Sequence, residues 1–168
     1  ATINAGVLYV RTAGYLTPGD GGEDFFKWVA ADPGHAGKFQ SANGRWFEKI
    51  NRAEMDVRQF GGKCDGVTDD YVAWQAALDC LPSQGGDVWF DGHTLISQSL
   101  VIGNGSTGLL PSTRNGAGIR GRGGKAVYPL EGVFVFGPLT KMTWIGPANS
   151  PMIYILGPYR GFRFDNFM

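Results

Sequence analysis

The chain of 168 residues has little charge and almost no cysteine. Charged residues make up 18% of it and the formal net charge is zero, so it lacks the basic surface that nucleic acids and anionic membranes attract. No apolar run approaches the roughly 18 residues needed to span a bilayer. No charged segment followed by an apolar one marks a secretory signal. These absences predict that neither nucleic acid nor a membrane is a partner.

Cys64 and Cys80 are the only cysteines. Without histidines at suitable spacing, two cysteines cannot form the usual closed zinc site, and no other cofactor is expected. One interpretation is a disulfide, which requires a helix to fold back over a turn. The other, which we favour, is two unpaired thiols in a chain that folds in a reducing cytoplasm.

Glycine and aromatic residues are abundant, with 27 glycines and an aromatic share of 13%. This balance favours short strands joined by tight turns and argues against a helical bundle. The sequence starts at Ala1 and ends at Met168 in what reads as the middle of a strand. We therefore expect it to be a fragment of a longer polypeptide.

The first part of the chain, 1–50, has the pattern of a small β module. Its apolar and aromatic segments have strand propensity and alternate with turn-forming residues. The expected strands are 6–11, 25–29 and 45–50. The turn signals lie at 17–22, 32–34 and 43–44, the last being an Asn-Gly pair typical of hairpins.

A short helix is expected over 70–81, after a polar joint at 51–56. Asp69 is the expected N-cap because its carboxylate can accept the free backbone N–H groups of the first turn. Pro82 stops the helix. The apolar residues form one stripe, which consists of Ala73, Trp74, Ala77, Leu78 and Leu81.

The segment VRQFGGKCDGVTDD at 57–70, followed by YVAWQAALD at 71–79, resembles the start of the pectate-lyase-like right-handed β-helices. In that family a strand, a Gly-rich turn, an Asp pair and a short helix stand in this order. There the segment caps the N-terminal end of the β-helix. The resemblance implies that the helix covers apolar core and strand edges that would otherwise be exposed.

Later segments resemble the first coils of the same family. GGDVWFDGHTLISQSLVI at 85–102 and GIRGRGG at 118–124 are similar to its recurring strand and turn patterns. Further strands are expected at 142–146, 152–156 and 162–168, as in stacked coils of a solenoid. Residues 124–140 fit the pattern poorly and are expected to form a loop inserted between coils.

GYLTPGDGGEDFFKW at 14–28 and GRWF at 44–47 resemble a small module that often precedes the β-helix in phage tailspike and tail-fibre proteins. Together the resemblances imply a mainly β fold: a small β module at 1–50 that faces the virion, then 51–168. The second part would contain a capping α-helix and the first coils of a right-handed parallel β-helix, truncated at its end.

Three carboxylates, Asp65, Asp69 and Asp70, have the oxygen density that suits calcium or magnesium. We favour a structural role, in which Asp65 and Gly66 form a turn and the other two cap the helix, and we expect no metal. The Gly-rich run at 118–125 lacks the glycine spacing of a phosphate-binding loop, and Ala126 stands where such a loop needs Ser or Thr.

No catalytic residue can be assigned. His35 and His93 are expected to be surface turn residues, away from any Ser or Cys nucleophile. Glu131 and Asp165 can belong to a lateral face of later coils, but nothing pairs them as glycoside hydrolysis requires. The tryptophans can be sugar-stacking platforms, although we favour core packing for all of them: Trp28, Trp46, Trp74, Trp89 and Trp144.

The resemblance implies a homotrimeric tailspike or tail-fibre component of a bacteriophage virion, assembled in the host cytoplasm. Its N-terminal module would attach to tail, baseplate or neck proteins, and later coils would recognise a host surface polysaccharide. One alternative is a secreted, monomeric polysaccharide lyase or hydrolase. Another is a catalytically inactive structural adaptor of the virion. Whether the complete protein is a depolymerase stays open, and we expect no activity from these 168 residues alone.

Overall fold

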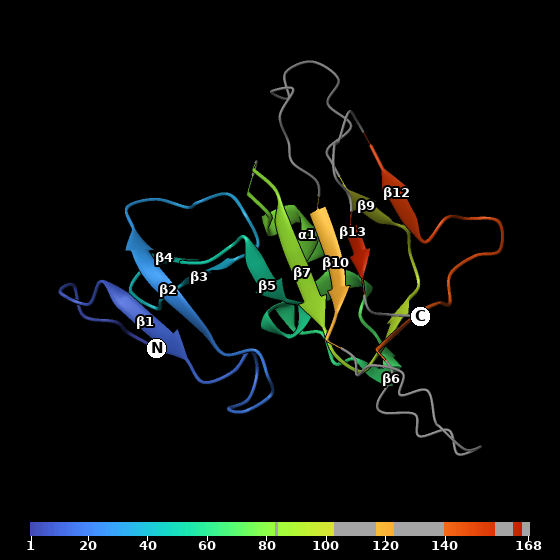
Figure 1. Cartoon of the computed structure of the whole chain (residues 1–168). Coiled ribbons are helices and arrows are strands. Elements are labelled where there is room, and N and C mark those ends of the chain that lie inside the picture. The colour runs from blue at the N-terminus through green and yellow to red at the C-terminus, as the bar shows by residue number, and fades with distance from the viewer. Residues whose placement is uncertain (83, 103–116, 123–139, 157–162, 166–168) are drawn as a thin grey trace, which may run out of the picture.

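The computed structural model describes residues 1–82, 84–102, 117–122, 140–156 and 163–165. This part of the chain is mainly β with one short α-helix, as the composition predicts. Figure 1 shows an antiparallel sheet near the N-terminus beside a set of parallel strands formed by later segments. Within the described ranges, no helix is long and apolar enough to cross a membrane.

The N-terminal sheet has four antiparallel strands in the order β1-β2-β4-β3. They are β1 (Tyr9–Thr12), β2 (Asp24–Val29), β3 (Lys38–Gln40) and β4 (Trp46–Lys49). Three of these were predicted, and β3 was missed because Phe39 is its only apolar residue. The predicted hairpin joins β3 to β4, with Gly44 at a φ of +81° that favours glycine.

In the remainder of the described residues, parallel strands form three further sheets. The first has the order β13-β10-β7-β5 and consists of β5 (Glu54–Asp56), β7 (Gly86–Phe90), β10 (Ala117–Gly121) and β13 (Arg163–Asp165). The second contains β6 (Asp65–Asp69), β8 (His93–Ile96) and β11 (Lys141–Trp144). The third contains β9 (Leu100–Ile102) and β12 (Ile153–Ile155).

Successive passes of the chain add one strand to each of these sheets in turn. β7, β8 and β9 make one pass, and β10, β11 and β12 make the next. The strands stack in register, so that Val88 pairs with Met55 on one side and with Ile119 on the other. Each pass therefore contacts the passes before and after it, as the predicted stacked coils require.

The segment before the helix differs from the prediction in two ways. The expected polar joint at 51–56 contains strand β5, and the expected strand at the start of 57–70 is the 3₁₀ helix η1 (Val57–Phe60). The cause is a capping box, in which Asp56 accepts from the backbone N–H of Arg58 at 3.0 Å and Gln59 accepts from that of Asp56 at 3.0 Å.

The α-helix, α1 (Tyr71–Cys80), has nearly the predicted bounds. Ala73, Trp74, Ala77 and Leu78 of the predicted stripe are buried, and Leu81 packs against them just beyond the last turn. Asp70, not Asp69, occupies the N-cap position, and its side chain makes no capping hydrogen bond.

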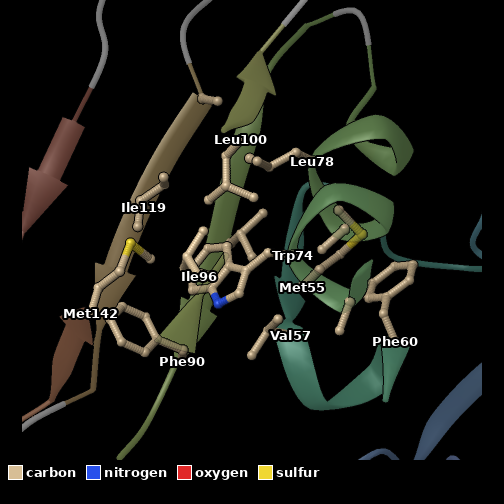
Figure 2. Close-up of a cluster of buried hydrophobic side chains, with 14 of the residues drawn as sticks. Met55, Val57, Phe60, Trp74, Leu78, Phe90, Ile96, Leu100, Ile119 and Met142 are labelled. Carbon is tan, nitrogen blue, oxygen red and sulfur yellow. The ribbon is translucent and has the colours of Figure 1, made fainter. Parts of the chain in front are cut away.

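The apolar interior lies between α1, η1 and the parallel strands (Figure 2). Trp74 of α1 is fully buried and meets the ring of Phe90 edge to face, with centroids 5.1 Å apart. Leu78 points toward Leu100 of β9, and Met55 fills the space beside η1 (Figure 2). The helix thus covers one side of this interior. Apolar burial of this kind contributes about 25 cal/mol per Å² to the stability of the fold.

A buried polar chain crosses the same interior. The indole N–H of Trp74 donates to the hydroxyl of Thr94 at 2.9 Å, and this hydroxyl donates to the carboxylate of Asp70 at 2.8 Å. The carboxylate also accepts from the backbone N–H groups of Lys63 and Cys64, at 2.7 and 3.1 Å. Each polar group in this series of hydrogen bonds has a partner, so the free-energy cost of burying these groups is offset.

Both cysteines are buried and free, which agrees with the favoured interpretation of unpaired thiols. Burial raises the pKa of Cys64 to about 12 and raises that of Cys80 as well. Neither thiol is therefore activated as a nucleophile.

Lys49, at the end of β4, connects the antiparallel sheet to η1. The ammonium of Lys49 lies against the carboxylate of Asp24 and donates to Gln59 of η1 at 2.8 Å. Burial lowers the pKa of Lys49 to about 8, and the electrostatic effects of Cys80 and of Asp56 oppose this shift. Gln59 also donates to the carbonyl of Glu23 at 3.3 Å.

Candidate functional site

The outer face of the β13-β10-β7-β5 sheet carries charged and aromatic side chains. Alternate residues of each strand face away from the core, and those at matching register positions lie side by side. One such row runs across all four strands and consists of Asp56, Trp89, Arg120 and Asp165. The sheet thus places residues that are far apart in sequence on one surface.

Arg120 is the central cation of this face. Its Nε lies 3.2 Å from the carboxylate of Asp87 and 3.6 Å from that of Asp165. Its guanidinium also lies over the indole of Trp89, 5.0 Å from the ring centroid. Gly118 makes room for this arrangement, because a Cβ there would lie 1.9 Å from a carboxylate oxygen of Asp87.

A groove lies at the β5 side of this face, next to η1, and we call it the Trp89 groove. Its volume is about 380 Å³. It is lined by Asn51, Glu54, Met55, Asp56, Gln59, Trp89 and Arg122. Buried Met55 is an apolar lining residue, and all the other side chains in the lining carry polar or aromatic groups.

Asp56 is the carboxylate of the groove with an altered proton affinity. Burial raises its pKa, and the backbone N–H of Arg58 and the guanidinium of Arg122 oppose that rise. One of its oxygens accepts the η1 capping bond, and the other lies 3.4 Å from Arg122. Because both oxygens have partners, the geometry favours a role for Asp56 in positioning Arg122 and the start of η1.

The three carboxylates predicted to be structural are not gathered into a site. Asp65 accepts from the backbone of Val67 and Thr68 at 2.9 and 2.7 Å, which makes the predicted turn. Asp69 caps the first turn through the N–H of Tyr71 at 3.1 Å. Asp70 occupies the N-cap position, but its carboxylate belongs to the buried polar chain and makes no capping hydrogen bond. Among the described residues, no group of three or more His, Cys, Asp or Glu side chains can hold a metal ion.

His35 lies in a bend, as predicted, but it is half-buried and not on the open surface, whereas His93 was wrongly predicted to be a turn residue. His35 lies 3.3 Å from a carboxylate oxygen of Glu48 and 3.7 Å from the sulfur of Cys80. Burial lowers the pKa of His35, and Glu48 opposes the shift. This Cys-His-Glu contact is not an activated nucleophile, since burial also raises the pKa of Cys80. His93 belongs to β8 and lies 2.8 Å from the hydroxyl of Thr143.

The remaining predicted positions are only partly visible. Residues 118–122 of the Gly-rich run 118–125 belong to β10 and its end, and 123–125 lie outside the described residues. Glu131 also lies outside them, as does all of the expected inserted loop 124–140 except Thr140. Asp165, its proposed companion on a lateral face, pairs with Arg120.

Core packing was predicted for all five tryptophans, and it is correct in full only for Trp74. Trp28 is 41% exposed and carries the guanidinium of Arg45 over its ring at 5.7 Å. Trp46, Trp89 and Trp144 are half-buried, so none of them is fully enclosed in the core.

Sequence reasoning missed the residues of the Trp89 groove. The signal that was available is the alternation at 87–90, where Val88 and Phe90 point inward and Asp87 and Trp89 point outward. The partners of Trp89 come from β5 and from the end of β10. The register of the parallel strands brings β5 and the end of β10 to Trp89, and the capping box of η1 adds Gln59.

Comparison with known proteins gives a partial match in sequence. No protein-family profile matches the chain. Over 77 residues it is 36% identical to depolymerase 1, capsule K30/K69-specific, of Klebsiella phage K5-2. The match covers 45% of this chain and 10% of that protein, so the chain spans about a tenth of its relative's length.

Two solved structures resemble the fold. Tailspike protein 2 of the Escherichia coli O157:H7 bacteriophage CAB120 has a TM-score of 0.55 at 14% identity, over 93% of this chain and 18% of that one. ORF18 of Geobacillus virus E2 has a TM-score of 0.45 at 18% identity, over 78% of this chain and 23% of that one. The first of these likenesses indicates a shared fold for the region compared.

Proposed function

We propose that the chain is the virion-proximal part of a bacteriophage tailspike or tail fibre whose complete form binds a host surface polysaccharide. In this proposal 1–50 is the attachment module, and 51–168 begins a right-handed parallel β-helix of the pectate-lyase-like type. The complete protein is a homotrimer and a component of the phage tail, assembled in the host cytoplasm.

The observation that carries the proposal is the stacking of β7-β8-β9 under β10-β11-β12 directly after an antiparallel sheet. The sequence match to a capsule-specific phage depolymerase supports the same assignment. A solenoid presents long lateral faces on rigid strands, and such faces suit the recognition of an extended polymer.

The N-terminal sheet supports the attachment part of the proposal. Large exposed apolar side chains gather there: Val7, Leu8, Tyr9, Tyr15, Leu16, Phe25, Trp28 and Ile50. Tyr9 and Phe25 lie on one face of the sheet, because Tyr9 pairs with Lys27 and Phe25 pairs with Arg11. Exposed apolar surface of this kind marks protein interfaces, here with other protomers and with virion proteins.

The name of the Klebsiella phage relative favours a second candidate, in which the complete protein also cleaves the polysaccharide. We assign no catalytic residue to this chain. Any acid and base groups of such an enzyme would lie on coils beyond those described.

The test uses the complete protein that contains this chain, incubated with encapsulated cells and with capsule-deficient cells of the phage's host. Selective adsorption to encapsulated cells is expected, and equal adsorption to both would overturn the proposal. Release of reducing ends or unsaturated sugars from purified capsule would identify a depolymerase, whereas adsorption without release would identify a passive fibre.

A further inference from the structure

The Trp89 groove has a composition that suits a sugar ring. Trp89 is half-buried and lines an open groove, and the part of its indole that Arg120 and Arg122 leave uncovered can stack on the C–H face of a pyranose. Around it stand the amides of Asn51 and Gln59, a carboxylate at Glu54 and the guanidinium of Arg122. Planar groups of this kind can donate and accept hydrogen bonds with adjacent hydroxyls.

The groove is also held in shape before any ligand arrives. Gln59 accepts from the backbone of Asp56 and from Lys49, at 3.0 and 2.8 Å. Arg122 is oriented by its 3.4 Å contact with Asp56 and by the Trp89 ring, 5.8 Å from its guanidinium carbon. Groups fixed in this way lose little conformational freedom on binding, which favours affinity.

The charge of the groove selects among sugars. Its lining contains two carboxylates, Glu54 and Asp56, and one guanidinium, Arg122, which already lies beside Asp56. Among the ion pairs of the described residues, none includes Glu54. A uronic acid or sialic acid would therefore meet an excess negative charge, whereas an uncharged hexose or N-acetylhexosamine would not.

We propose that the Trp89 groove is a binding subsite for one uncharged sugar unit, on the first coil beside the antiparallel sheet. This inference rests on the proposed polysaccharide receptor and adds a location and a sugar class to it. The subsite is separate from any site on later coils.

The experiment is saturation-transfer NMR on the 168-residue chain with three probes: methyl glucoside, N-acetylglucosamine and glucuronic acid. Saturation transfer to at least one of the two uncharged sugars is expected, with binding of glucuronic acid at least fivefold weaker. Trp89→Ala should weaken binding at least tenfold. Trp46→Ala is the matched control, since Trp46 is also half-buried beneath a cation, Lys38, and it should leave binding unchanged.

A second pair of variants separates binding from folding. Glu54 is exposed, so Glu54→Ala should keep the wild-type melting temperature and weaken binding, while Glu54→Gln, which still hydrogen-bonds, should retain it. Unchanged binding in both Trp89→Ala and Glu54→Ala would overturn the inference, as would tighter binding of glucuronic acid or no binding of either uncharged sugar. If the complete protein still adsorbs to capsule in those cases, the proposed function stands and only the subsite fails.

Discussion

Asp20 holds the loop between β1 and β2 through backbone hydrogen bonds. Its carboxylate accepts from the backbone N–H groups of Tyr15, Leu16, Thr17 and Gly22, at 2.8 to 3.0 Å. These donors, that of Thr17 foremost, hold the pKa of Asp20 far below its ordinary value of 3.8. The loop in turn packs on η1, where the ring of Tyr15 lies over Gly61.

We therefore predict an acid-dependent loop. Since the folded-state pKa is lowered, the carboxylate contributes stability above pH 3.8, and this contribution is lost as the pH falls through the lower folded-state value. In Asp20→Ala, the amide protons of Tyr15 and Gly22 should exchange faster at neutral pH, as measured by NMR. Asp79→Ala, at an exposed helical position, is the control. Unchanged exchange in Asp20→Ala would contradict this role.

The hydroxyl of Thr94 links Trp74 to Asp70 in the buried polar chain. Thr94→Val keeps the shape of the side chain but leaves the Trp74 indole N–H without its acceptor and removes one donor from Asp70. An unmet buried polar group costs about 1–3 kcal/mol, and urea unfolding should register that loss. Thr17→Val, at an exposed loop position, should cost under about 0.5 kcal/mol. Equal stability of the two variants would show that the chain contributes little.

At the scale of elements, the sequence was informative where periodicity and turn chemistry act locally. The helix and the hairpin at 43–44 follow from such patterns, whereas the strands within 85–102 were expected from the family resemblance. The 3₁₀ helix was missed because its cause is one side-chain pair, Asp56 and Gln59, within a segment that resembles a strand. The bonding of His35 and Asp70 was missed because their partners lie far along the chain.

The same reasoning explains the site. Trp89 was predicted to belong to the core together with the other tryptophans. It points outward because side chains along β7 alternate between the two faces of the sheet. Parallel pairing brings Asp56 of β5 and Arg122, at the end of β10, beside Trp89, and Gln59 comes from η1 directly after β5. Register between parallel strands is not encoded by a local turn, so sequence reasoning alone could not assemble this groove.

α1 offers a direct test of its covering role. Leu78 is 7% exposed and faces the core, whereas Val72 on the same helix is 75% exposed. Leu78→Asp should lower stability by several kcal/mol because it places an unpaired charge against apolar side chains. Val72→Asp is the matched control and should melt near the wild-type temperature. Similar melting temperatures for the two variants would mean that α1 does not cover the interior.

At the scale of the whole molecule, we predict that the protein containing this chain is a trimer that uses the face of Tyr9 and Phe25. Tyr9 is 67% exposed and Phe25 is 54% exposed, and solvation of both rings is unfavourable. Phe25→Lys should shift the mass measured by light scattering toward the monomer. Val67→Lys, at an 83% exposed position on β6, should not. A wild-type mass of one protomer would refute the trimer.

The Lys49 contacts have a mechanical consequence. Four residues, 50–53, separate β4 from β5, and Lys49 joins β2 to η1 across that link. A pull on the N-terminal sheet is therefore shared between the backbone and this side-chain clamp, so both parts should yield together. Optical tweezers should record one extension step for the wild type and two for Lys49→Met, in which the clamp through Asp24 and Gln59 is removed. A joint built this way transmits torque as well as tension.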